Sequence, residues 1–215
     1  MIAILWVTIY VLCGLCFSFF WIGVLKSPFW NDPAEPGNPH YFENDRLYWG
    51  AISDYAICGE RLYLLYDEKE VMQCYDLSGN YLCSYSFCFS QNGSAALHTD
   101  GSNLFLEDRK ANFYVFSPER GFQAYYARED NIEEIESCSE RFFTRDAART
   151  AENGERFELK WASVYKTDRD ETTEKVVARP FWMAIFQNGR AIICTIVLGA
   201  MIAVRFFLRQ RKNAA

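Results

Sequence analysis

The chain has 215 residues, half of them hydrophobic, and a formal net charge of −6. Residues 26–180 contain 17 of the 22 Lys and Arg and all 28 Asp and Glu, which gives this region a net charge of −11. Such an acidic region repels phosphate backbones, so the composition argues against nucleic acid as a partner. The length allows one domain of average size together with two membrane segments.

The N-terminal 25 residues contain no charged side chain and are long enough to cross about 30 Å of hydrocarbon as an α-helix. A cleaved signal peptide is the alternative, but no basic residue precedes the apolar run and no small-residue cleavage site precedes Lys26. The sequence therefore predicts a retained transmembrane helix. Gly14 and Ser18 lie four positions apart in it and would let a second helix approach closely.

Residues 26–46 hold four of the six prolines and show no hydrophobic periodicity. This composition predicts an extended linker that leaves the membrane. From residue 47 to residue 179 the chain turns to short aromatic and aliphatic runs separated by turn residues, which predicts a β-rich domain outside the membrane.

Within this domain, residues 59–87 predict strand, turn, strand, turn and strand, and residues 101–127 repeat the pattern about forty residues later. The repeat matches Asp67 with Asp108, Tyr75 with Phe116 and Tyr81 with Phe122. A third and poorer copy begins near residue 140, which gives about three repeats of about forty residues. Residues 157–165 then alternate strictly between apolar and polar, as expected of another strand.

Each of the first two copies has a Gly-containing turn with an aromatic residue directly beyond it, in residues 76–81 and 117–122. In period and turn placement these repeats resemble β-propeller blades of the WD40, NHL or quinoprotein type. The resemblance implies a partial propeller, and an antiparallel meander or a β-sandwich gives a similar pattern. The predicted fold class is therefore mainly β, an antiparallel meander or partial β-propeller-like domain between two transmembrane α-helices.

The C-terminal hydrophobic segment, residues 180–208, is divided by Arg190. We expect an interfacial lead-in followed by a transmembrane helix that begins at residue 191, with Arg205 reaching back to the interface. The alternative places residues 181–204 in the bilayer with Arg190 inside it. Lys26, Arg205, Arg209, Arg211 and Lys212 flank the two predicted helices. The basic tail places both termini in the cytoplasm and residues 26–180 outside the cell or in a lumen, with the plasma membrane as the expected location.

Five cysteines lie in the predicted domain, at positions 58, 74, 83, 88 and 138. If Ser78 and Gly79 form a two-residue hairpin loop, Cys74 falls opposite Cys83, close enough for a cross-strand disulfide. The alternative is that these residues are buried free cysteines that act as small hydrophobic side chains.

The sequence contains no recognised catalytic, cofactor-binding or metal-binding motif. The first functional hypothesis is a membrane-held binding or scaffold module whose partner is another protein or a second copy of the chain. The second is an accessory subunit of a membrane transport or secretion complex. The third is a tethered enzyme that uses carboxylates on sheet loops, for which Asp67, Asp76 and Asp108 are the candidates, although turn roles explain them better.

Overall fold

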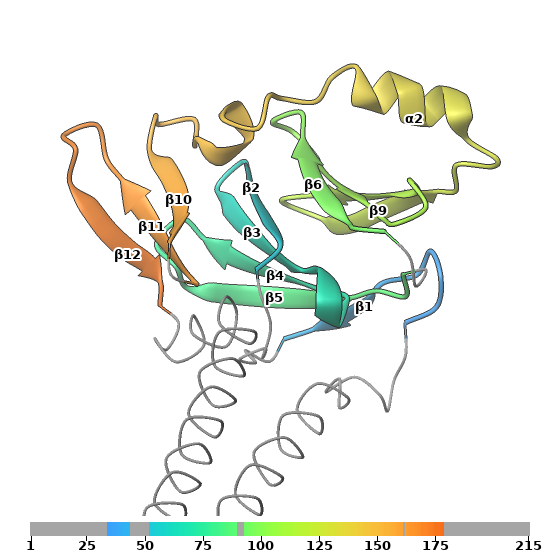
Figure 1. The fold of residues 1–215 in the computed structure, drawn as a ribbon, viewed down its shortest axis with the longest axis horizontal. Coiled ribbons are helices and arrows are strands. Elements are labelled where there is room, and N and C mark those ends of the chain that lie inside the picture. The colour runs from blue at the N-terminus through green and yellow to red at the C-terminus, as the bar shows by residue number, and fades with distance from the viewer. Residues whose placement is uncertain (1–33, 44–51, 90–92, 161, 179–215) are drawn as a thin grey trace, which may run out of the picture.

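The computed structural model describes residues 34–43, 52–89, 93–160 and 162–178. Their strands form three antiparallel sheets, so the mainly-β prediction is confirmed (Figure 1). Within these ranges no helix is both long and apolar enough to cross a bilayer. Both predicted transmembrane segments lie outside the described residues, together with Gly14, Ser18, Lys26 and the basic residues from Arg205 to Lys212.

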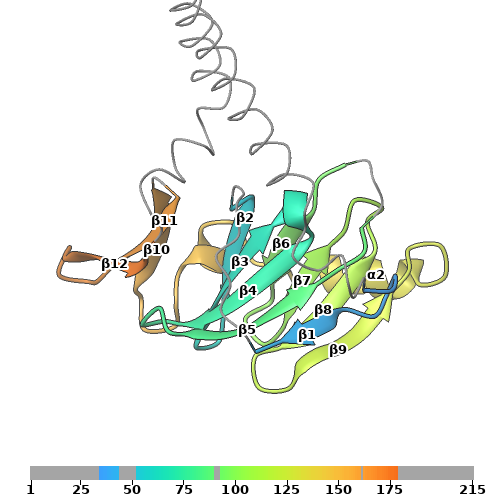
Figure 2. The same ribbon diagram turned by 90° about the horizontal axis from the view of Figure 1, so that it is seen from below.

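The first sheet has the strand order β1-β5-β4-β3-β2. Its strands are β1 (His40–Phe42), β2 (Asp54–Cys58), β3 (Arg61–Tyr66), β4 (Val71–Asp76) and β5 (Tyr81–Ser86), and the 3₁₀ turn η1 (Asp67–Lys69) joins β3 to β4. Strands β2 to β5 follow one another as a meander, while β1 pairs with the outer edge of β5 (Figure 2). The predicted linker therefore contains a strand, which sequence pattern misses because three residues show no period.

The second sheet repeats this meander with β6 (Ala96–Thr99), β7 (Leu104–Glu107), β8 (Phe113–Ser117) and β9 (Gly121–Tyr126). Tyr75 pairs with Tyr81 in the first sheet and Phe116 with Phe122 in the second, and each pair lies directly beside a register shift. The two matched sequence segments thus share a β-bulge at the same position.

The third sheet consists of β10 (Arg156–Lys160), β11 (Ser163–Thr167) and β12 (Thr173–Val177). The helix α2 (Ile132–Ser139) and the 3₁₀ turn η2 (Ala147–Arg149) connect β9 to this sheet. Residues 140–146, where a third repeat was expected to begin, contain no strand. The third sheet is therefore a shorter meander and starts later than the repeat period predicts.

The first sheet is the middle layer, because both of its faces are buried. Tyr63 and Leu65 of β3 pack toward the second sheet, whereas Leu64 and Tyr66 pack toward the third. This explains why β3 reads as a continuous apolar run and not as an alternating one. On the outer face of the second sheet, Ile135 and Cys138 of α2 cover Phe105, Phe113 and Val115.

The three sheets do not form a propeller, so the partial-propeller alternative is wrong, and each sheet is built around an antiparallel meander. They are stacked face to face and close no ring around an axis (Figure 1). The repeat correctly reflects two equivalent meanders, but the packing of α2 against the second sheet covers the face on which a further blade would pack. Local strand and turn patterns are shared by meanders of either architecture, and the packing partner of each face decides between them.

Candidate functional site

A groove of about 700 Å³ lies where the turns between β2 and β3, β6 and β7, and β8 and β9 meet. We call it the hairpin-end groove. Its polar and charged lining side chains are Glu60, Arg61, Ser102, Asn103, Ser117, Glu119, Arg120, Gln123 and Glu152. The groove therefore offers both signs of charge and several neutral hydrogen-bonding groups.

Local hydrogen bonds fix the turns that form this groove. Asp100 accepts the backbone N–H groups of Ser102 and Asn103 at 3.0 and 2.7 Å. In the β8–β9 hairpin, the Ser117 hydroxyl accepts the backbone N–H groups of Glu119 and Arg120. Such side-chain bonds hold short turns in one conformation, so the groove is largely preformed.

A polar cluster lies beside the groove, on the face of the first sheet that packs against the second. Arg61 lines the groove, and its charge acts on both Cys74 and Cys83. Tyr63 is the β3 partner of Cys74 in the β3–β4 ladder, and Tyr85 is buried in the same cluster as both cysteines. A Cβ added at Gly121 would lie 2.6 Å from the Tyr85 hydroxyl, which places the cluster against the β8–β9 turn.

Cys74 and Cys83 are direct partners in the β4–β5 ladder, and both are buried. The predicted two-residue loop is wrong: Asp76 pairs with Asn80 around a three-residue turn, with the Asp76 N–H donating to the Asn80 carbonyl at 3.0 Å. The β-bulge beside Tyr75 restores the register, so the two cysteines still face each other. Both are free cysteines in this structure.

The two thiols differ in their surroundings. The facing Cys83 thiol, together with burial, holds the pKa of Cys74 far above its usual range. The facing Cys74 thiol lowers the pKa of Cys83 despite its burial, and the Arg61 charge and the Tyr85 hydroxyl act in the same direction. Cys83 is therefore the thiol of this pair that ionises more easily.

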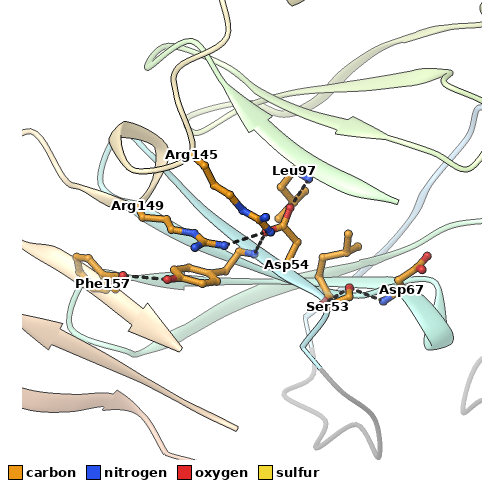
Figure 3. A network of polar contacts seen from close by, with 9 residues as sticks. Ser53, Asp54, Asp67, Leu97, Arg145, Arg149 and Phe157 are labelled. Carbon is orange, nitrogen blue, oxygen red and sulfur yellow. Dashed lines mark hydrogen bonds and ion pairs between the residues drawn. The ribbon is translucent and has the colours of Figure 1, made fainter. Parts of the chain in front are cut away.

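A second polar network centres on Asp54, a buried residue at the start of β2 (Figure 3). Its carboxylate accepts the backbone N–H of Leu97 in β6 at 3.0 Å. Arg145, which precedes η2, and Arg149, its last residue, approach the other carboxylate oxygen at 3.4 and 3.5 Å. The Arg149 guanidinium also lies over the Tyr55 ring, 4.3 Å from its centroid.

This network joins the three sheets. Asp54 connects the first sheet to the edge strand of the second. The Tyr55 hydroxyl donates to the Phe157 carbonyl of β10 at 3.0 Å and so connects the first sheet to the third. We assign the Asp54 network to the architecture of the domain and not to ligand binding, because the Asp54 carboxylate is buried and already bonded to Leu97 and the two arginines.

The three aspartates of the enzyme hypothesis do not form one site. Asp76 and Asp108 each accept backbone N–H groups within their own turns. Asp67 pairs with Arg109, whose Nη2 lies 3.1 Å from its carboxylate. Asp67 precedes β4 and Asp76 ends it, so they lie at opposite ends of that strand. No group of three His, Cys, Asp or Glu side chains suited to a metal ion occurs among the residues that the structure describes.

On the outer face of the second sheet, the Glu107 carboxylate of β7 contacts the His98 ring of β6. Its Oε2 lies 2.9 Å from His98 Nε2, and Phe142 stacks on the His98 ring with centroids 4.6 Å apart. The hydrogen bond from His98 holds the pKa of Glu107 below its ordinary value of 4.5, although burial opposes this shift.

Because the pKa of Glu107 is lower in the folded state, its contribution to stability is complete above about pH 4.5 and is lost as the pH falls through the lowered pKa. We expect Glu107→Gln to abolish the contribution of Glu107 to the loss of stability in acid. This contribution is below about 1 kcal/mol, because the Glu107–His98 pair is partly solvated. Urea unfolding of the full-length protein at several pH values from about 6 to about 3 measures it. An unchanged acid profile in Glu107→Gln would contradict the prediction.

Sequence pattern missed the groove and the Asp54 network, and in the polar cluster it identified only the facing pair Cys74 and Cys83. The turn residues that carry the groove were visible as Gly- and Pro-containing breaks between strands, but only the packing of two sheets brings those breaks together. Comparison of the chain with protein-family models and with curated proteins found no match.

Proposed function

We propose that this protein is a membrane-tethered binding module whose hairpin-end groove holds a polar segment of a protein partner. The observation that carries the proposal is the meeting of three hairpin turns from two sheets around one groove. Loops placed on a rigid β-scaffold are a common location for recognition sites.

The lining indicates the chemistry of the partner. Arg61 and Arg120 suit carboxylate groups, and the Glu60, Glu119 and Glu152 carboxylates suit Lys or Arg side chains. Asn103 and Gln123 offer amides that can bond to a peptide backbone. The groove is thus suited to an extended polypeptide segment that carries both signs of charge. The partner is either a different protein or a second copy of this chain.

The tether rests on the two apolar segments, residues 1–25 and 180–208, which lie outside the described residues. The basic residues from Arg205 onward favour a cytoplasmic C-terminus. With two crossings, the β domain lies on the outer or luminal side, where the groove is available to extracellular or luminal proteins.

Site-specific photo-crosslinking in native membranes tests the proposal. A photoreactive amino acid at Glu119, in the groove, is expected to give a discrete crosslinked product, which mass spectrometry identifies as another protein or as a second copy of the chain. The matched control is Asp170, an exposed acidic residue in the β11–β12 turn outside the groove, which is expected to give none.

Charge reversal at the groove sharpens this experiment. We expect Arg120→Glu to lower the crosslinking yield about tenfold, the effect of losing one ion pair at an interface. Arg156→Glu, on the exposed side of β10, is expected to leave the yield unchanged. Equal products from positions 119 and 170, or no response to Arg120→Glu, would overturn the proposal.

A further inference from the structure

The facing pair Cys74 and Cys83 carries an inference that does not depend on the proposed function. Directly opposed residues of an antiparallel pair have Cβ atoms about 4.5–5.5 Å apart, and a disulfide requires about 3.5–4.5 Å. A small approach of β4 and β5 is therefore enough to join the sulfur atoms of these directly opposed residues.

Cys83 is the cysteine of the pair that an external reagent reaches first. Strand β1 pairs with Ser84, Tyr85 and Ser86 of β5 and does not reach Cys83, the residue next to Ser84 on its N-terminal side. The preceding residue, Leu82, is 40% exposed, whereas the Cys83 side chain is 5% exposed and Cys74 is fully buried. A local opening of β5 beyond the end of β1 uncovers Cys83 before Cys74.

The polar neighbours favour attack by Cys83. The facing Cys74 thiol, the Arg61 charge and the Tyr85 hydroxyl all lower the pKa of Cys83. These groups stabilise a thiolate, which is the form that attacks disulfides. Cys58, on the same buried face, lacks these favourable contacts, and burial raises its pKa to about 11.

We propose that Cys74 and Cys83 form a thiol–disulfide exchange site, with Cys83 as the attacking thiol and Cys74 as the resolving thiol. The Cys83 thiolate attacks a low-molecular-weight disulfide such as oxidised glutathione, forms a mixed disulfide and releases one thiolate. The Cys74 sulfur then attacks the Cys83 sulfur, loses its proton to solvent and releases the second thiol. The protein dithiol is oxidised by two electrons, and the external disulfide is reduced to two thiols.

The test uses the full-length protein in detergent and glutathione buffers of increasing oxidised fraction. Free thiols are blocked with one alkylating reagent, and disulfides are then reduced and labelled with a second. Chymotryptic digestion separates Cys74 from Cys83, because Tyr75 and Tyr81 lie between them. We expect Cys74 and Cys83 to be oxidised together to one disulfide. We expect reduced glutathione to convert this disulfide back to two free thiols.

Cys138 and Cys58 are the internal controls, since both are buried and neither faces a second cysteine in the strand pairings. They are expected to stay reduced under the same conditions. The proposal is overturned if Cys83 stays reduced in the folded protein while the denatured chain oxidises, or if Cys83 keeps a mixed disulfide although Cys74 is free.

Variants assign the two roles. Cys74→Ala is expected to leave Cys83 as a stable mixed disulfide with glutathione, whereas Cys83→Ala is expected to leave Cys74 unmodified. Arg61→Gln is expected to slow the alkylation of Cys83 by about threefold or more, because the thiolate is less stabilised, while Arg156→Gln, on the exposed side of β10, is expected to leave the rate unchanged. Glutathione is the only ligand in these assays, so their failure leaves the proposed function untouched. Should a cysteine variant not fold, the experiment on the unaltered chain still decides.

Discussion

Replacing Asp54 by Ala is expected to lower the free energy of unfolding by about 3 kcal/mol. The substitution leaves the N–H of buried Leu97 without an acceptor, which alone costs about 1–3 kcal/mol. It also removes the carboxylate that faces Arg149, a partly buried cation. Urea unfolding of the full-length protein, followed by near-ultraviolet circular dichroism, measures the loss.

Two further variants separate the parts of this effect. Asp54→Asn keeps an oxygen for the Leu97 N–H and is expected to cost about half as much as Asp54→Ala. Arg145→Ala is expected to cost less than about 1 kcal/mol, because the Arg145 side chain is 72% exposed and its ion pair is screened by water. If Arg145→Ala costs as much as Asp54→Ala, the assigned role of Asp54 in joining the sheets is wrong.

Replacing Gly79 by Ala is expected to cause a loss of similar size, about 3 kcal/mol, at the contact between the first and third sheets. Gly79 has φ of +86°, so any side chain there costs about 1–2 kcal/mol of backbone strain. In addition, a Cβ at this position would lie 2.0 Å from the Val176 carbonyl oxygen of β12. Because that neighbour is backbone, β12 has to move away from the β4–β5 turn.

Gly154 is the matched control for this prediction. It also has φ of +86°, but a Cβ there meets only the far end of the flexible Arg169 side chain, with 2.9 Å to Nε as the shortest approach. Gly154→Ala is expected to lower the free energy of unfolding by about 1–2 kcal/mol, through backbone strain alone. Equal losses in the two variants, by the same urea unfolding measurement, would show that the contact with β12 contributes nothing.

The parts of the fold that sequence pattern predicted correctly are local. Alternating aromatic and aliphatic residues, ended by Asp, Gly and Asn, identify the strands and turns of the first two sheets. The match of Tyr75 and Tyr81 with Phe116 and Phe122 is local too, because each pair closes a hairpin of its own.

The features that sequence pattern missed depend on partners far along the chain. Asp54 bonds to Leu97, Arg145 and Arg149, which lie 43, 91 and 95 residues away. At the level of sequence, Asp54 follows Ser53 and reads as a turn residue like many others. The groove also depends on residues far apart in the sequence, because Arg61 belongs to the first sheet and Arg120 to a turn of the second. A single sequence does not specify which faces of three meanders meet, and those contacts create both sites.

The middle position of the first sheet has a consequence for folding of the chain during its synthesis on the ribosome. The sheet is complete at Ser86, but the strands that cover its two faces begin at Ala96 and Arg156. At translation rates of about 5–20 residues per second, the second covering layer follows only after several seconds. A nascent sheet with an apolar surface on either side is prone to aggregation during that interval. A chaperone that covers the nascent sheet, or delayed pairing of β2 to β5 until the third sheet has emerged, would limit this aggregation.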